Sequence, residues 1–85
     1  MSTLIFRFSS NTKPDMQRTI DPILTALDRC GIAYDPKYTL EQVNRGVVDR
    51  VNWELSIRII AVVSEDLLDC IRDRLPPRVD VEVAN

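Results

Sequence analysis

Two runs of alternating apolar and polar residues in the middle of the chain constrain its fold more than any other feature. Apolar side chains alternate with polar or charged ones over residues 34–41, and the same pattern recurs over residues 51–59. A period of two is typical of a strand that buries one face. The polar stretch between the runs contains Gly46, so the pattern predicts a β-hairpin with a short turn.

The alternation also predicts a register for the hairpin, because all apolar side chains of the two strands should share one face. The predicted pairs are Tyr38 with Trp53, Leu40 with Val51, and Tyr34 with Ile57.

A helix over residues 40–51 is the competing interpretation. Apolar residues there also fit one helical face, and Thr39 with Gln42 resembles a capping box. Gly46 and the β-branched valines disfavour a helix. The hairpin accounts for a longer stretch of the sequence and is the preferred prediction.

Before the hairpin, the sequence predicts a strand over residues 4–9 and then a helix. Thr12 is the candidate N-cap of this helix, with Asp15 three residues later, and Gly31 supplies a left-handed C-terminal cap. Pro22 lies inside the helical pattern and cannot donate a backbone hydrogen bond. We therefore expect a kink at this position, or two short helices with the second capped by Asp21.

After the hairpin, Ser64 is predicted to cap a second helix that stops before Pro76 and Pro77. Alternating valines over residues 79–83 predict a last strand. The order of elements is therefore β-α-β-β-α-β, which is typical of the ferredoxin-like fold of the α+β class. Residues 1–85 are predicted to form one such domain, with two helices on one face of a four-stranded antiparallel sheet whose first and third strands are central.

Charge and residue types exclude several functions. The chain has 13 acidic and 11 basic residues and a net charge of −2, which disfavours nucleic-acid binding. It has no histidine, so the usual general base and metal ligand are missing. Cys30 and Cys70 form no metal-binding pair and are expected to be free, buried thiols in a reducing compartment. We expect no enzyme activity, no metal and no cofactor.

The sequence also bears on location. The N-terminus lacks the basic region of a signal peptide, and the longest apolar run, residues 59–63, is too short to cross a bilayer. A cytoplasmic protein without a membrane segment is expected.

The candidate site is the face of the sheet that the helices leave open. Arg7 on the first strand and Arg58 on the third are expected to lie close together there, with Glu54 and Ile60 beside them. Arginine is enriched where proteins bind carboxylates, phosphates or other proteins. The leading hypothesis is therefore a small non-catalytic protein-interaction module that forms a homodimer: an adaptor or inhibitor, encoded by a phage or accessory to a larger complex.

The alternative hypothesis is a ligand-sensing domain. The order of elements resembles that of small-ligand regulatory domains of the ACT type, and residues 28–32 are similar to the end of their first helix. This resemblance implies a ligand site in the first loop, at Asn11, Thr12 and Asp15. Domains of this type usually carry a glycine where this chain has Pro14 and Asp15.

Overall fold

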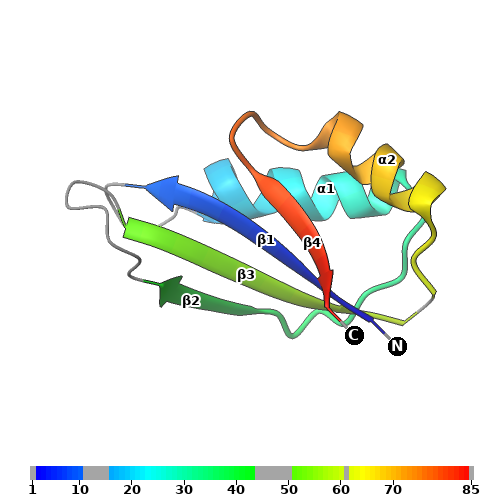
Figure 1. Cartoon of the computed structure of the whole chain (residues 1–85), viewed down its shortest axis with the longest axis horizontal. Helices are drawn as coiled ribbons and strands as arrows, with labels where there is room; N and C mark the ends of the chain where they lie inside the picture. The colour runs from blue at the N-terminus through cyan, green and yellow to red at the C-terminus, as the bar shows by residue number, and fades with distance from the viewer. Residues whose placement is uncertain (1, 11–15, 44–50, 61, 85) are drawn as a thin grey trace.

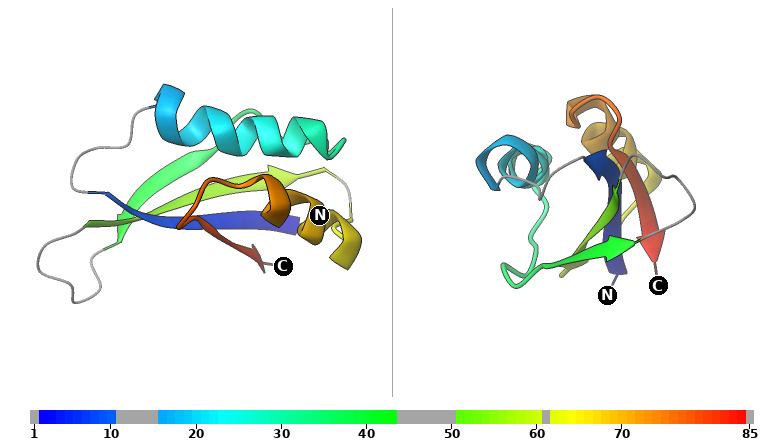
Figure 2. Two further views of the ribbon diagram at one scale, coloured as in Figure 1. Left: turned by 90° about the horizontal axis from the view of Figure 1, so that it is seen from above. Right: turned by 90° about the vertical axis from the view of Figure 1, so that its left-hand side faces the viewer.

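A computed structural model describes residues 2–10, 16–43, 51–60 and 62–84 of the chain. It shows an α+β domain in which a four-stranded antiparallel sheet carries both helices on one face (Figures 1 and 2). In chain order the elements are β1 (Ser2–Ser10), η1 (Met16–Ile20), α1 (Asp21–Arg29), β2 (Thr39–Val43), β3 (Val51–Ile59), α2 (Glu65–Arg74) and β4 (Asp80–Ala84).

The sheet has the strand order β2-β3-β1-β4, so β1 and β3 are central and β2 and β4 are edges, as the sequence predicts. The central strands alternate strictly between the two faces. Their apolar side chains face the helices and form most of the core, together with the apolar stripes of α1 and α2. The buried core consists of Leu4, Phe6, Phe8, Ile20, Ile23, Leu27, Ile32, Leu55, Ile57, Ile59, Leu68 and Ile71.

The predicted hairpin register is wrong. Leu40 lies opposite Leu55 rather than Val51, which shifts the pairing by four residues, and Gln42 rather than Tyr38 lies opposite Trp53. The prediction assumed a short turn, whereas β2 ends at Val43 and β3 begins only at Val51. The shift is an even number of residues, so each side chain keeps its predicted face.

The N-terminal half of the predicted strand 34–41 is irregular. Tyr34 forms an isolated bridge with Ile59, paired two residues away from its predicted partner Ile57, and regular pairing begins at Thr39. Between them, the Asp35 carboxylate accepts a hydrogen bond of 2.9 Å from the Lys37 backbone N–H, which turns the chain locally.

The competing helix is excluded over residues 40–43, because these residues belong to β2. The predicted turn at Gly46 lies outside the described residues.

Pro22 marks a change of pitch rather than a gap in the first helix. The π-helical turn η1 runs directly into α1, and Ile20, with helical backbone angles, occupies the N-cap position. Asp21 is the first residue of α1 and not its cap, because the helix does not restart. Pro22 lies in the first turn of α1, directly after the point where the π-helical turn gives way to the α-helix. The predicted caps at Thr12 and Asp15 lie outside the described residues.

The other two predicted helix ends are confirmed. Gly31 has a φ of +69°, its N–H donates to the Asp28 carbonyl, and the Ile32 N–H donates to the Leu27 carbonyl, each at 3.1 Å. This is a Schellman cap, with Ile32 and Leu27 together in the core. At α2, the Ser64 hydroxyl accepts a hydrogen bond of 3.3 Å from the Leu67 N–H.

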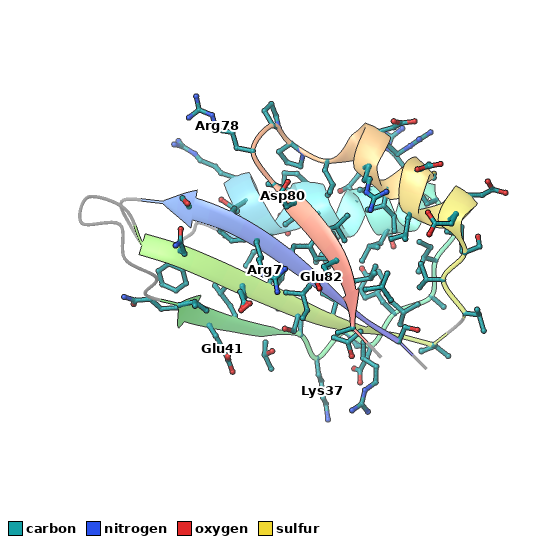
Figure 3. The ribbon with its side chains drawn as sticks, viewed as in Figure 1. Arg7, Lys37, Glu41, Arg78, Asp80 and Glu82 are labelled. Carbon is teal, nitrogen blue, oxygen red and sulfur yellow. A yellow bond between two sulfur atoms is a disulfide. The ribbon has the colours of Figure 1, made fainter. Side chains whose placement is uncertain are left out.

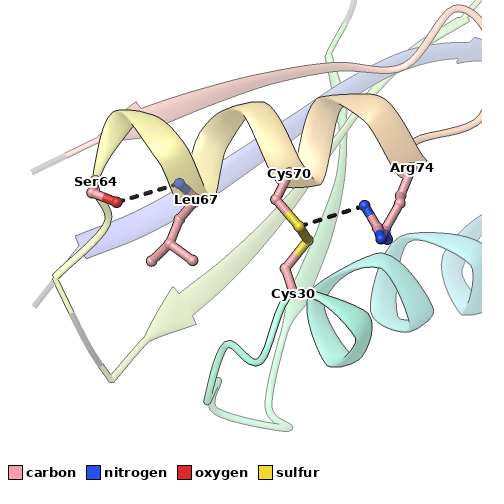
Figure 4. Close-up of a disulfide and its surroundings, with 5 residues drawn as sticks. All are labelled: Cys30, Ser64, Leu67, Cys70 and Arg74. Atoms are coloured by element: carbon pink, nitrogen blue, oxygen red, sulfur yellow. Dashed lines mark hydrogen bonds between the residues drawn. A yellow bond between two sulfur atoms is a disulfide. The ribbon is translucent and has the colours of Figure 1, made fainter.

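The prediction of free thiols is wrong, because Cys30 and Cys70 form a disulfide. Both helices lie on the same face of the sheet, and the C-terminal end of α1 meets the middle of α2 (Figure 4). The Cα atoms of the two cysteines are 6.0 Å apart, although the two residues are 40 positions apart in the sequence. The pair lacks the spacing of a local motif, and only the tertiary packing of the helices brings it together.

Candidate functional site

The face of the sheet opposite the helices is uncovered by any described element and carries the candidate site (Figure 2). In the antiparallel register Arg7 on β1 lies opposite Glu54 on β3 and opposite Asp80 on β4, and Glu54 lies opposite Glu41 on β2. Residues directly opposite each other share a face. One row of four charged residues therefore crosses the whole sheet, with a single cation among three carboxylates.

Arg7 is held by two of its neighbours. Its Nε lies 3.4 Å from Glu54 Oε2, and its terminal nitrogen donates a hydrogen bond to the Glu82 carboxylate (Figure 3). The pKa of Arg7 is raised above its ordinary value, chiefly by the hydrogen bond to Glu82 and further by the negative charges of Glu82 and Glu54; partial desolvation opposes the rise. The arginine side chain remains 40% exposed and can still meet a partner.

Within the four strands, the open face carries more acidic than basic side chains. Four of these side chains are carboxylates and two are arginines, by the alternation of the strands and their register. The carboxylates are Glu41, Glu54, Asp80 and Glu82, and the arginines are Arg7 and Arg58. On the strands of this face, acidic side chains therefore surround Arg7.

The four predicted protein-binding residues do not form one cluster. Arg7 and Glu54 are in contact, but Arg58 lies opposite Thr3, four residues further along β3. That offset is about 13 Å along the strand, so the two arginines are not neighbours. Ile60 follows the end of β3 and is 60% exposed. The residues of the alternative ligand site, Asn11, Thr12 and Asp15, lie outside the described residues.

A hollow of about 220 Å³ adjoins Arg7 toward the far end of β1. Among its lining residues, Ser9 and Asn52 face each other across β1 and β3, and the Ser9 hydroxyl lies 2.7 Å from Asn52 Oδ1. Arg78, just before β4, also lines the hollow and has a φ of +70°, which is uncommon for a residue with a side chain. Sequence analysis missed this part of the site; the β1–β3 register would have revealed the Ser9–Asn52 pair.

The described residues contain no group of three or more cysteine, aspartate or glutamate side chains arranged to hold a metal ion. No helix among them is long and apolar enough to cross a membrane.

Comparison with known proteins identifies no family for this chain. No protein-family model matches the chain, and no curated protein matches it. Among solved structures, the chain is similar to the de novo designed protein Foldit4, with 17% identity and a TM-score of 0.47, covering 98% of this chain and 92% of that one. It is also similar to the hypothetical protein ORF119 from Sulfolobus islandicus rod-shaped virus 1, with 7% identity and a TM-score of 0.48, covering 99% of this chain and 66% of that one.

Proposed function

We propose that the chain is a small non-catalytic protein-interaction module, an adaptor or inhibitor, that binds a partner protein through the open face of its sheet. The observation that supports this proposal most is the Arg7 cluster. The Arg7 side chain is 40% exposed and lies between Glu54 and Glu82 on a face that no described helix covers. Ionic groups held in place before binding contribute to the specificity of an interface, because they need little reordering.

The charge of the face indicates the chemistry of the partner. Four carboxylates against two arginines favour a partner segment rich in lysine and arginine, because complementary charge steers association. Two copies of this chain meeting through the same face would set acidic rows against each other. The interaction is therefore proposed with a different, basic chain, and any homodimer should use another surface.

The binding proposal can be tested by NMR with a basic peptide. We would titrate the ¹⁵N-labelled chain with a short peptide rich in lysine and arginine, and with a peptide of the same length in which glutamine replaces the basic residues. The basic peptide should perturb backbone signals of β1, β3 and β4, and added salt should weaken the effect. The neutral peptide should leave them unchanged.

A pair of matched variants locates the contact. Glu41→Gln with Asp80→Asn removes two charges from the open face, whereas Glu65→Gln with Asp66→Asn removes two from the first turn of α2. The first variant should weaken peptide binding several-fold and the second should not. Equal weakening, or perturbed signals confined to the helices, would contradict the proposal.

Whether the chain forms a homodimer is a separate question. Sedimentation of the chain alone over a range of concentrations answers it.

The cytoplasmic location also stays a proposal, and it loses the support of free thiols. Disulfides persist in oxidising compartments and are rare in the cytosol of most organisms. The measurement is the mass of the chain from its own cells after immediate blocking of thiols. A cytoplasmic chain should carry two blocking groups, and a chain from an oxidising compartment should carry none.

A further inference from the structure

The Cys30–Cys70 disulfide has different electrostatic surroundings at its two sulfur atoms. A terminal nitrogen of Arg74 lies 3.6 Å from the Sγ of Cys70, one helical turn away on α2 (Figure 4). Cys30 occupies the C-cap of α1. The partial negative charge at the C-terminal end of a helix disfavours an anion there, whereas a guanidinium favours one.

The disulfide lies outside the fully buried core. Both cysteines are half-buried rather than buried, and neither belongs to the fully buried core. Beside them, a groove between the helices is lined by Asp21, Arg29 and Arg74 among other residues. Two cations against one acid in this groove would attract a negatively charged thiolate.

We propose that the Cys30–Cys70 pair is a redox site that reacts in a fixed direction with a dithiol reductant. Arg74 determines the direction, because it stabilises the thiolate of Cys70 and so makes Cys70 the better leaving group. The proposal does not depend on the proposed interaction function, since it concerns the opposite side of the molecule.

The exchange has two steps. A thiolate of the reductant attacks Cys30 Sγ and forms a mixed disulfide; the Cys30–Cys70 bond breaks, and its electron pair stays on Cys70 Sγ. The second thiol of the reductant, as a thiolate, then attacks the reductant's own sulfur in the mixed disulfide and releases Cys30 as a thiolate. The dithiol is oxidised by two electrons to a cyclic disulfide, and the two cysteines are reduced and take up protons according to the pH.

The first test measures how fast dithiothreitol reduces the oxidised, folded chain. Arg74→Gln should slow the reduction about twofold to fivefold, the size expected for a solvent-exposed charge. Arg72→Gln is the matched control, because Arg72 lies on the same helix but pairs with Asp69 at 3.7 Å. It should change the rate much less. Equal rates for the two variants would overturn the role of Arg74.

The second test finds which sulfur is attacked. The oxidised chain is mixed briefly with glutathione, which has one thiol and so lacks the fast intramolecular second step, and is then quenched with acid before a second glutathione can react. Peptide mass spectrometry should find glutathione mainly on Cys30. An adduct mainly on Cys70, or equally on both, would overturn the proposed direction. Because both tests start from the oxidised chain, unfolding of the reduced form does not affect them.

Discussion

Arg7 on the first strand donates a hydrogen bond to Glu82 on the last, so an ion pair on the open face joins residues 75 positions apart. Glu54 on β3 completes the cluster from the other side. The pair ties edge strand β4 to the central sheet through side chains as well as through the backbone ladder. It is exposed to solvent, so its effect should depend on salt.

Replacing Arg7 with glutamine should lower stability at low salt and have less effect in 1 M NaCl. The variant leaves four carboxylates on one face without the Arg7 cation. Their mutual repulsion lowers stability, and salt screens this repulsion. Urea unfolding at low and high salt measures the difference. Arg58→Gln is the control, since no ion pair with another described residue holds Arg58; a salt effect as large for Arg58 as for Arg7 would show that the Arg7 cluster has no special role.

Removing the disulfide should have the largest effect on stability. Closing a loop of 40 residues contributes about 4 kcal/mol by restricting the unfolded chain. In a domain of 85 residues this corresponds to a fall in Tm of roughly 15–30 °C. Cys30→Ala with Cys70→Ala, measured by calorimetry, should therefore melt far below the oxidised chain and near the reduced one. A fall of only a few degrees would show that the packing of the helices alone holds them.

Substitution of Gly31 should cost stability through the backbone alone. A Cβ atom at this position would meet no heavy atom within 4 Å, yet the residue has a φ of +69°. Gly31→Ala should therefore lower the free energy of unfolding by about 1–2 kcal/mol. Gly31→Asn should cost less, because asparagine tolerates this conformation better. Equal stability of the two variants would show that the positive φ of this position does not determine the cost.

Tyr34 should make the fold less stable at high pH. Burial raises the pKa of Tyr34 above its ordinary value, and Asp28 raises it further through its charge and a hydrogen bond. A raised pKa means that the unfolded chain loses this proton first. The contribution of the protonated Tyr34 to the stability of the fold is therefore complete below about pH 10, the pKa of an unperturbed tyrosine. It is lost as the pH rises through the pKa of Tyr34 in the folded chain.

The check on Tyr34 is urea unfolding between pH 8 and pH 11 for the native chain and for Tyr34→Phe. The native chain should lose stability more steeply than the variant above pH 10. Parallel curves would mean that Tyr34 ionises equally in the folded and unfolded chains.

The order of elements and the buried face of each strand could be predicted because both depend on local patterns. The alternation over residues 51–59 requires one face of β3 to be buried, wherever its partner lies. The register could not be predicted, because it depends on where β2 and β3 begin and end. The shift of Leu40 from Val51 to Leu55 is the result.

The candidate site was predictable in part for the same reason. Arg7 and Glu54 share the open face by alternation alone, but their contact, and the distance of Arg58 from both, depend on the β1–β3 register. The disulfide was missed because a separation of 40 residues carries no local signal. Only the side-by-side packing of α1 and α2 on one face could have suggested it.

The pairing of β1 with β4 has a mechanical consequence. These two strands carry the chain ends and are antiparallel neighbours, with Thr3 opposite Ala84 near the end of the molecule where both termini lie (Figure 1). A force that pulls the termini apart would separate β1 from β4 starting at Thr3 and Ala84. The hydrogen bonds between the two strands would break one after another, so the pair would resist the force only weakly. The 40-residue loop closed by the disulfide would then stay out of the extension, withholding about 140 Å of chain length until the bond is reduced.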